Sequence, residues 1–241
     1  MIFFISDSHL GSQDRERENY KSQKLLSFLD HIKSRAEALY IVGDLFDFWF
    51  EYRHVIPKYN PLIIWKLAEL VHGGVSVHYV AGNHDYWLGS FLENQVGMTI
   101  HVEPVDINHM HQKIFIAHGD GIIKKDRGYR ILKKILRNPL SILLFRLLHP
   151  DWGVSLANLV SRASRTASEN KELDREFLED IKNFVYEKFE SGFDYVILGH
   201  LHCPTVEREN GKVYINLGDW MRHFTYGLLK DGKLTLNYWE K

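Results

Sequence analysis

Five loops of the chain carry side chains that can bind metal ions, and each loop follows a short apolar run. The runs span residues 2–5, 39–42, 75–80, 113–117 and 195–198. The loops after them read Asp7-Ser8-His9, Gly43-Asp44-Leu45-Phe46-Asp47, Gly82-Asn83-His84-Asp85, His118-Gly119-Asp120 and Gly199-His200-Leu201-His202. Runs of this composition are typical of buried strands. Because ligands collect at the carboxyl ends of strands in α/β sheets, we expect the five loops to converge on one site.

The donor set of these loops consists of carboxylates, imidazoles and an amide, without thiolates. Such a set suits a borderline divalent cation such as Mn²⁺, Fe²⁺ or Zn²⁺. The candidates are too many for one ion and suit two ions that share a bridging carboxylate. Two ions about 3.5–4 Å apart can hold a phosphoryl oxygen and activate a water near neutral pH. The loops therefore predict a dinuclear site for phosphoryl chemistry.

Helical patterns alternate with the strand-like runs, which indicates an α/β layered fold. Apolar residues recur at helical spacing in 20–34, 61–71 and 173–189. Further strands are expected at 99–102, 205–208, 213–217, 225–229 and 234–238. Between 127 and 165 we expect two or three helices, broken at Asn138-Pro139 and His149-Pro150, because proline cannot continue a helix interior. The chain has no long linker, so we expect one domain over residues 1–241, with a helical lid insertion at 122–168.

The motifs D-x-H, G-D-x-x-D, G-N-H-D, H-G-D and G-H-x-H occur in this order between residues 7 and 202. In type and order they resemble the calcineurin-like metallophosphoesterase superfamily. The resemblance implies an α/β sandwich of two mixed β-sheets flanked by helices, with two divalent ions. One ion would be held by Asp7, His9, Asp44 and His202. The other would be held by Asp44, Asn83, His118 and His200, with Asp44 bridging.

The same resemblance assigns roles to residues beside the implied ligands. His84 is expected to contact the substrate phosphate and to protonate the leaving oxygen. Asp85 is expected to orient His84, since a catalytic imidazole needs a partner that fixes its tautomer. Asp47 and Asp120 have two open interpretations: they support the site, or they cap a helix or bond loop amides.

The composition excludes several classes of protein. The 241 residues carry 30 Lys+Arg against 31 Asp+Glu, a formal charge of −1, and 45% are apolar. These values exclude a disordered or low-complexity chain. The single cysteine, Cys203, excludes an internal disulfide and a cysteine-based zinc cluster, and we interpret it as a packing residue. The start lacks a signal-peptide pattern and no apolar run reaches roughly 18 residues, so we expect a cytoplasmic protein.

The predicted insertion differs in charge and hydropathy from the rest of the chain. Between 124 and 165 there are ten basic and two acidic residues, and seven of the nine residues at 140–148 are apolar. In 130–137, basic residues alternate with Ile and Leu, so a helix there would have one cationic and one apolar face. Such a helix can lie on an anionic membrane surface, cover a cleft for acyl chains, or pack on its own domain. Nucleic-acid binding is not expected, because overall basicity and interleaved aromatic residues are absent.

The insertion, the stretches 43–49 and 82–89, and Leu217-Gly218-Asp219-Trp220 resemble one branch of the superfamily. This branch is the UDP-2,3-diacylglucosamine pyrophosphatases of lipid A biosynthesis. The resemblance implies a nucleotide-activated glycolipid as substrate. Water would attack the α-phosphorus of its UDP group to give UMP and 2,3-diacylglucosamine 1-phosphate (lipid X), with the acyl chains under the insertion.

The resemblance to this branch also implies a metal, a location and substrate contacts. The metal would be Mn²⁺, and the protein would be peripheral on the cytoplasmic face of the inner membrane. Asn83, His84 and Arg162 would bind the substrate. Many members of the branch carry arginine where this chain has His84.

Two other functions remain open from the sequence. A soluble phosphodiesterase or nucleotidase would use the same metal residues, and its insertion would be only a lid. A non-catalytic scaffold would keep the fold, but such proteins usually lose a ligand or the general acid, and this chain has the whole set.

Overall fold

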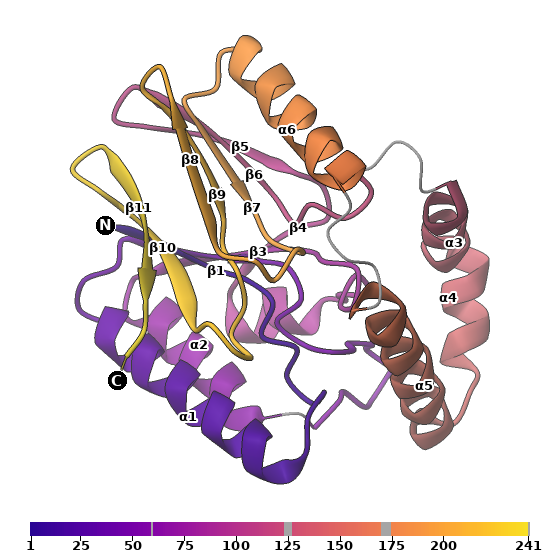
Figure 1. Cartoon of the computed structure of the whole chain (residues 1–241). Helices are drawn as coiled ribbons and strands as arrows, with labels where there is room; N and C mark the ends of the chain where they lie inside the picture. The colour runs from indigo at the N-terminus through magenta and orange to yellow at the C-terminus, as the bar shows by residue number, and fades with distance from the viewer. Residues whose placement is uncertain (59, 123–126, 170–174, 241) are drawn as a thin grey trace.

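Two β-sheets pack face to face in the computed structural model, and helices cover their outer sides (Figure 1). The structure describes residues 1–58, 60–122, 127–169 and 175–240, and in the helices the side chains at 127–130, 132, 162–169 and 175–177 are outside that description. Both sheets are mixed, so the expected α/β sandwich of two mixed sheets flanked by helices is confirmed.

The first sheet has six strands in the order β11-β10-β1-β2-β3-β4. Their bounds are β1 (Ile2–Ile5), β2 (Ala38–Val42), β3 (Ser76–Val80), β4 (Thr99–His101), β10 (Thr225–Lys230) and β11 (Lys233–Tyr238). Strands β1 to β4 pair in parallel, and β10 and β11 add an antiparallel edge beside β1. The parallel strands β1, β2 and β3 therefore end at the same edge, where their polar loops begin.

The second sheet has five strands in the order β5-β6-β7-β9-β8. Their bounds are β5 (Val105–His109), β6 (Gln112–Ala117), β7 (Tyr195–Leu198), β8 (Thr205–Glu209) and β9 (Lys212–Asn216). Strands β6, β7 and β9 are parallel, whereas β5 and β8 are antiparallel to their neighbours. The loops after β6 and β7 consequently start side by side, and the amide of Gly199 donates to the carbonyl of His118 at 2.9 Å.

The apolar core has three parts that follow from the layers. Between the sheets, alternate residues of the facing strands interdigitate: Phe4, Tyr40, Val42, Ile116, Ile197 and Ile215 are among them. Helices α1 (Arg15–Ile32) and α2 (Pro61–His72) cover the outer face of the first sheet, and α6 (Arg175–Glu190) covers that of the second. In α1 the buried residues Leu25, Phe28, Leu29 and Ile32 fall at helical spacing, which defines one apolar face.

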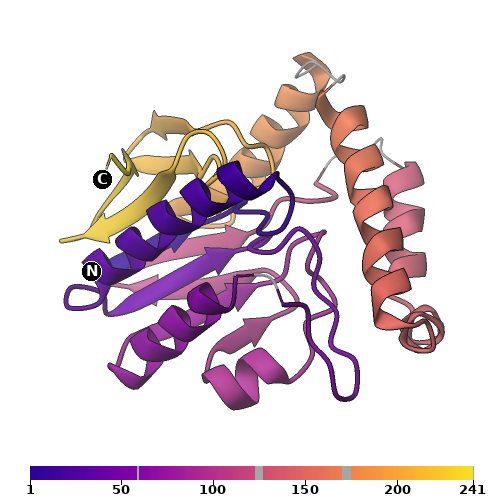
Figure 2. The same cartoon turned by 90° about the horizontal axis from the view of Figure 1, so that it is seen from below.

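Three further helices lie between β6 and α6 in the chain: α3 (Arg127–Leu136), α4 (Pro139–Arg146) and α5 (Pro150–Glu169). The two predicted breaks are confirmed, because α4 begins at Pro139 and α5 begins at Pro150. Asn138 caps α4 by accepting a hydrogen bond from the amide of Leu140. Figure 2 shows these helices together at one side of the sandwich. We call residues 127–169 the insert.

Several elements differ from the predicted ones. Strand β5 was not among the predicted strands. It lies at the edge of its sheet, and its residues alternate between partly buried and exposed. Helix α1 begins at Arg15, five residues before the predicted start, because Asp14 accepts from the amide of Arg17 and so caps an exposed polar first turn. A single π-helical turn, η1 (Leu92–Val96), was not predicted either.

Candidate metal centre

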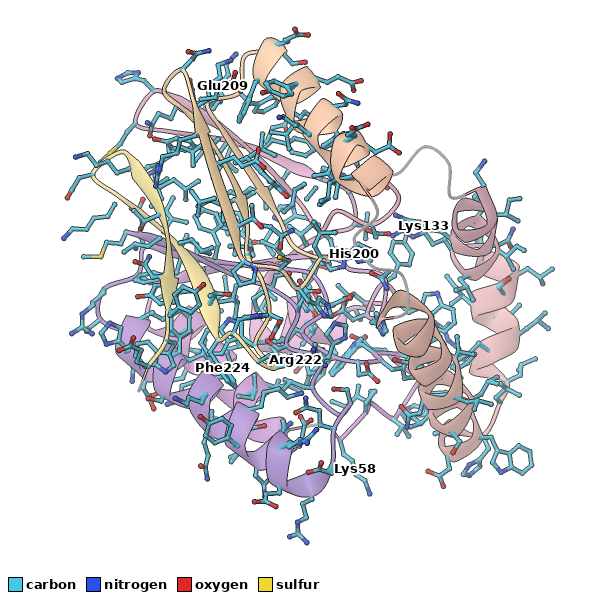
Figure 3. All side chains as sticks on the ribbon, viewed as in Figure 1. Lys58, Lys133, His200, Glu209, Arg222 and Phe224 are labelled. Carbon is cyan, nitrogen blue, oxygen red and sulfur yellow. The ribbon has the colours of Figure 1, made fainter. Side chains whose placement is uncertain are left out.

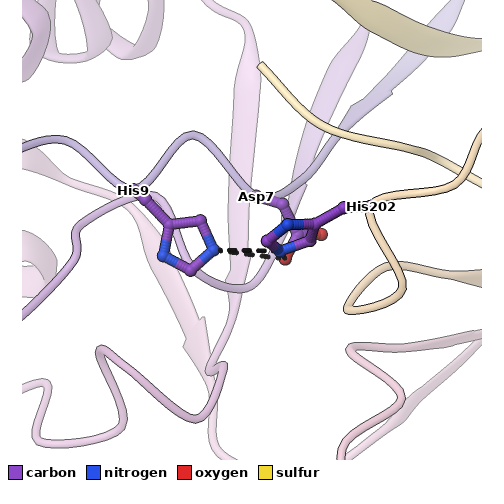
Figure 4. A group of neighbouring side chains, drawn as sticks. All are labelled: Asp7, His9 and His202. Atoms are coloured by element: carbon purple, nitrogen blue, oxygen red, sulfur yellow. Dashed lines mark hydrogen bonds and ion pairs between the residues drawn. The ribbon is translucent and has the colours of Figure 1, made fainter. Parts of the chain in front are cut away.

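The loops after β1 and β7 bring together the first group of candidate ligands, Asp7, His9 and His202 (Figure 4). His202 Nε2 lies 3.1 Å from both Asp7 Oδ1 and His9 Nε2, and His9 Nε2 lies 3.6 Å from Asp7 Oδ1. Asp7 and His9 are almost completely buried. Three ligand atoms this close together, two of them on buried side chains, are suited to coordinate one cation.

The loops after β2, β6 and β7 form a second group, Asp44, His118 and His200. His118 Nε2 lies 3.3 Å from Asp44 Oδ2 and 3.0 Å from the Oδ1 atom of Asn83. The other ring nitrogen of His118 lies 2.9 Å from the carbonyl oxygen of Val42, to which its N–H donates. This hydrogen bond fixes the tautomer and leaves Nε2 as the ligand atom.

The carboxylate of Asp44 lies between the two groups. Its Oδ2 atom is 3.7 Å from His9 Nε2 on one side and 3.3 Å from His118 Nε2 on the other. Its Oδ1 atom accepts a hydrogen bond from the backbone amide of His84 at 2.9 Å. One carboxylate shared by two ligand groups is the arrangement that a bridged pair of ions requires.

The backbone holds most of these residues in an unusual conformation. Asp7, His9, Asp44, His200 and His202 have left-handed φ values of 54°, 41°, 52°, 70° and 52°. Such a conformation costs a non-glycine residue about 1–3 kcal/mol and persists only where the surrounding structure enforces it. Strained residues of this kind cluster at functional sites, and here they are five of the seven predicted ligands.

Two motif glycines make room for the ligands. A Cβ on Gly82 would lie 2.0 Å from Asp44 Oδ1, and a Cβ on Gly43 would lie 2.3 Å from His118 Nδ1. Gly43 also has a left-handed φ of 80°. Any side chain at either position would displace a candidate ligand, so the loops need glycine there.

The electrostatics of the two groups favour added positive charge. Burial raises the pKa of Asp44 and of Asp7, but the facing imidazoles outweigh it and hold both pKa values well below their usual range. Burial lowers the pKa of His118, yet Asp44 and Asp7 raise it well above its usual value. The pKa of His9 rises to about 10, because Asp47, Asp7 and Asp44 outweigh its burial. The residues therefore fit divalent cations, which would satisfy the same carboxylates.

Comparisons with known proteins agree with this geometry. A family model described as calcineurin-like phosphoesterase matches residues 1–204. The chain belongs to the calcineurin-like phosphoesterase family. The protein is therefore a metal-dependent hydrolase of phosphate esters or anhydrides.

Two curated relatives are similar over nearly their whole length. The chain is 33% identical to a protein of Porphyromonas gingivalis (strain ATCC BAA-308 / W83) named UDP-2,3-diacylglucosamine hydrolase, over 99% of this chain and 97% of that protein. It is 32% identical to a protein of the same name from Neisseria meningitidis serogroup B (strain ATCC BAA-335 / MC58), over 95% and 94%. Among solved structures, an archaeal phosphodiesterase shares the fold, with a TM-score of 0.52, 15% identity and 98% coverage of both chains.

In this phosphoesterase, His84 lies beside Asp44, whose Oδ1 accepts from its amide, and the rings of His84 and His9 meet edge to face with their centres 4.7 Å apart. His84 Nδ1 lies 3.1 Å from the carbonyl oxygen of Asp47 and 3.6 Å from its Oδ1. Ser161 of α5 lies 3.2 Å from the same nitrogen, and its hydroxyl donates to Asp47 Oδ1 at 3.0 Å. Burial lowers the pKa of His84 more than Asp44 and Asp47 raise it.

The prediction that Asp85 orients His84 is wrong. Both carboxylate oxygens of Asp85 are directed to backbone amides and a phenol: Oδ1 accepts from the amides of Gly82 (3.0 Å) and Asp44 (3.3 Å), and Oδ2 accepts from the amide of Phe46 (3.2 Å) and the Tyr79 hydroxyl. The chain turns sharply after His84, so the two neighbouring side chains point apart. Asp85 instead fastens the loop after β3 to the loop after β2.

The contacts of Asp47 favour the first of its two interpretations, support for the site, over capping of a helix. Besides its contacts to His84, its Oδ1 lies 3.5 Å from His9 Nδ1, on the ring edge opposite the ligand atom. Sequence reasoning missed Ser161 altogether, because a serine within an amphipathic helix carries no chemical signature. Arg162, another predicted substrate residue, is part of helix α5, but its side chain is outside what the structure describes.

A buried lysine supports the loop that carries His9. Lys21 Nζ donates to the carbonyl oxygen of His9 at 2.8 Å and lies 3.0 Å from Glu18 Oε2. Glu18 Oε1 accepts from the amide of Gly11 at 2.9 Å and from Asn60 Nδ2 at 2.8 Å. Helix α1 is thus bonded to the strained loop. The sequence held no signal for this, since a lysine in an amphipathic helix is usually exposed.

The stretch Leu217–Trp220 closes the Asp7 side of the site. The amide of Trp220 donates to the carbonyl oxygen of Asp7 at 3.1 Å. Asp219 is buried and accepts hydrogen bonds from the amides of Met221 (2.7 Å) and Arg222 (2.6 Å), which shapes the turn after it. Figure 3 shows His200 and Arg222 at this end of the sandwich, between the sheets' loops and the insert.

Proposed function

We propose that this phosphoesterase hydrolyses UDP-2,3-diacylglucosamine to UMP and 2,3-diacylglucosamine 1-phosphate (lipid X), in lipid A biosynthesis. The names of the relatives, which align over nearly the full chain, support this substrate. The observation that carries the proposal is the junction at His84, where α5 of the insert reaches the phosphoryl site through Ser161. An insert that exposes large apolar side chains and contacts the candidate phosphoryl site suits a substrate that joins a phosphate to acyl chains.

The insert exposes a series of large apolar side chains on α4 and α5. Leu140, Leu143, Leu144 and Leu147 of α4 and its end are between 52% and 76% exposed, and Leu156, Leu159 and Val160 of α5 are between 47% and 67% exposed. Its Phe145 packs against Phe48, Phe50 and Trp87, whose loops also carry Asp47 and His84. The apolar surface is thereby continuous with the loops of the site. Acyl chains are ligands that would cover such a surface.

The metal residues and their partners divide the work of the reaction. Two divalent ions, for which we propose Mn²⁺, would be held by Asp7, His9, Asp44 and His202, and by Asp44, Asn83, His118 and His200. Once bound, they would supply positive charge to the phosphoryl oxygens and help to ionise the attacking water. Asn83 and His84 are the residues that we propose to contact the phosphate, together with Arg162.

We assign His84 the role of general acid. The oxygen of water loses a proton and bonds to the α-phosphorus, the bond from that phosphorus to the bridging oxygen breaks, and lipid X leaves with that oxygen and with the proton given up by His84. The Asp47 carbonyl accepts from Nδ1 of His84, which leaves Nε2 for the departing phosphate. Because burial lowers the pKa of His84, its imidazolium form gives up a proton readily.

We further propose that the protein works as a peripheral protein on the cytoplasmic face of the inner membrane. Lys134 and Arg146 of the insert are exposed next to its leucines. A surface that is both cationic and apolar binds anionic headgroups and inserts apolar side chains below them. Among the described residues, no helix is both long and apolar enough to cross a bilayer.

The proposal is tested by incubating the full chain with Mn²⁺, detergent and UDP-2,3-diacylglucosamine and separating the products by thin-layer chromatography. We expect UMP and lipid X in equal amounts, and no release after chelation of the metal. Hydrolysis in ¹⁸O-labelled water should place the label in UMP, since attack is at the α-phosphorus. Activity only on water-soluble phosphodiesters, indifferent to lipid, would show the alternative enzyme. No activity on any phosphoester with metal bound would show a scaffold.

A further inference from the structure

A cluster of basic side chains lies beside the candidate metal centre, where the insert contacts the loop after β6. Asp120 follows His118 by two residues and is paired with Lys133 of α3. Lys133 Nζ also donates to the carbonyl oxygen of Asp120 at 3.3 Å, and Arg137 lies 3.8 Å from Asp120 Oδ2. Figure 3 shows Lys133 extending from α3 on the side where His200 lies. The basic face of α3 is therefore turned toward the site.

The same C-terminal end of α3 (Arg127–Leu136) is also bonded to the loop that carries His84. The guanidinium carbon of Arg137 stacks over the ring of Tyr86, 3.6 Å from its centre. The indole N–H of Trp87 donates to the carbonyl oxygen of Leu136 at 2.9 Å. Tyr86 and Trp87 follow His84 directly in the chain, so α3 is held next to the candidate general acid.

A cavity of about 390 Å³ lies between these contacts, lined by Gly121, Lys133, Lys134 and Arg137. Among the residues that the structure describes, three cations line it, and the carboxylate of Asp120 is paired with Lys133 and lies 3.8 Å from Arg137. Stacking on Tyr86 occupies the face of the Arg137 guanidinium, and its N–H groups lie in the ring plane, where they can bind an oxyanion in a forked geometry. The cavity thus has a surplus of positive charge and is large enough for a phosphate group.

We propose that this cavity binds the second phosphate of a diphosphate substrate, the phosphate that departs with the sugar, an inference that rests on the function proposed above. A diphosphate that has one phosphorus at the metal residues must place the other phosphate next to them. The leaving phosphate gains negative charge as the bridging bond breaks, and cations fixed beside it stabilise that charge. A monoester or simple diester has no group for this cavity, so the cavity selects diphosphates.

The test compares two inhibitors that differ by one phosphate. UMP places its phosphate at the metal residues alone, whereas UDP adds the β-phosphate. With bis(p-nitrophenyl) phosphate as reporter substrate and saturating Mn²⁺, the inhibition constants of both are measured for the full-length protein and for Lys134→Ala and Arg137→Ala. Lys230→Ala, an exposed lysine of β10, is the matched control for lost surface charge.

We expect the unmodified protein to bind UDP more tightly than UMP, and each cavity variant to weaken UDP about ten-fold while UMP changes less than about two-fold. Arg137→Lys, which keeps the charge and loses the fork, should fall between. An unchanged ratio of the two constants in both alanine variants would overturn the proposal. If the ratio of the two constants is unchanged and the alanine variants bind anionic vesicles more weakly, the proposal is also overturned, and these cations are assigned to lipid headgroups.

The two proposals fail separately. If the unmodified protein releases no UMP from UDP-2,3-diacylglucosamine but the UDP preference depends on Lys134 and Arg137, the diphosphate subsite stands and the glycolipid assignment falls. If UMP is released and the variants keep the preference for UDP, the assignment of the substrate stands and the subsite falls.

Discussion

The metal centre and the insert differ in burial: the centre is made of buried polar side chains, and the insert exposes apolar ones. In the centre, buried carboxylates and imidazoles are held in left-handed backbone conformations, and a single added carbon at Gly82 would collide with Asp44. In the insert, the helices touch the body through a few residues, chiefly Phe145, Ser161 and Lys133, and expose rows of leucine.

The difference suggests that the metal centre carries the reaction and that the insert selects the substrate. A rigid, strained centre can perform the same phosphoryl chemistry on many substrates, since function depends on residues grafted onto a common fold. The exposed leucines of the insert can change without disturbing that chemistry. Substitutions in the centre should therefore abolish turnover on every phosphoester, and substitutions of these leucines should act on the lipid substrate alone.

The largest effect is expected from Asp44→Asn. The substitution keeps the shape but removes the charge that faces both ligand groups, so metal should be lost and turnover should fall by at least about 10³-fold. Metal analysis of the purified protein measures the first effect and a phosphodiester assay the second. Asp194→Asn, whose carboxylate accepts from the amide of Lys113 far from the site, is the control. Full metal content in Asp44→Asn would contradict its bridging position.

His84→Ala should separate chemistry from metal binding. The backbone amide of residue 84, which donates to Asp44, remains in the alanine variant, so metal content should be unchanged. Turnover should fall about 10²–10⁴-fold, the usual contribution of a general acid. A substrate whose leaving group needs no proton, such as a p-nitrophenyl ester, should lose less. Equal turnover in the metal-loaded variant would rule out this role.

Gly82→Ala tests how tightly the centre is packed. The new Cβ would lie 2.0 Å from Asp44 Oδ1 and 2.6 Å from its backbone nitrogen, so the loop must shift and turnover should fall about 10²-fold. The control is Gly74→Ala, where φ is 90° but no atom lies within 4 Å of the new Cβ. This control should lose about 1 kcal/mol of unfolding free energy through backbone strain and keep its activity. Similar activities in the two variants would show that the centre is adaptable.

Ser161→Ala tests the link between the two regions. It removes the hydroxyl that lies between Asp47 and His84, so we expect turnover on the glycolipid to fall about five- to ten-fold, the cost of one ordinary hydrogen bond. The pH dependence of kcat should shift as well, because the surroundings of His84 change. Ser155→Ala is the control on the same helix, where the hydroxyl only bonds to the carbonyl of Asp151. Identical pH profiles for the two variants would place Ser161 outside the reaction.

The smallest effect on the folded chain is expected from Leu147→Ser. Leu147 is 76% exposed, so the free energy of unfolding should change by less than about 0.5 kcal/mol. Binding to anionic vesicles and KM for the glycolipid should each worsen about two- to five-fold, while a water-soluble diester is hydrolysed as before. Leu62→Ser on α2, which is 67% exposed outside the insert, is the matched control. Equal loss of vesicle binding in both variants would remove the insert from the membrane contact.

Much of the site could be predicted from local sequence, because the loops are short and follow strands. Parallel pairing of β1, β2 and β3 aligns their ends, so Asp7, Asp44 and Asn83 start from the same edge without any knowledge of packing. The helix breaks at Pro139 and Pro150 were likewise predictable from the backbone limits of proline. Strand β5 was missed because only Val105 and Ile107 of its five residues are aliphatic, and it lies at a sheet edge where none of its residues is buried.

The five ordered motifs were enough to predict which residue types gather at the candidate metal centre, since they place carboxylates and imidazoles after strands. How those residues are supported became visible only in the folded chain: Asp85 bonds to backbone amides, Asp47 and Ser161 contact His84, and Lys133 pairs with Asp120. The physical reason is separation along the chain. Ser161 and Asp47 are 114 residues apart, and an amphipathic pattern shows which face of a helix is apolar but not which side chain it presents to a distant loop.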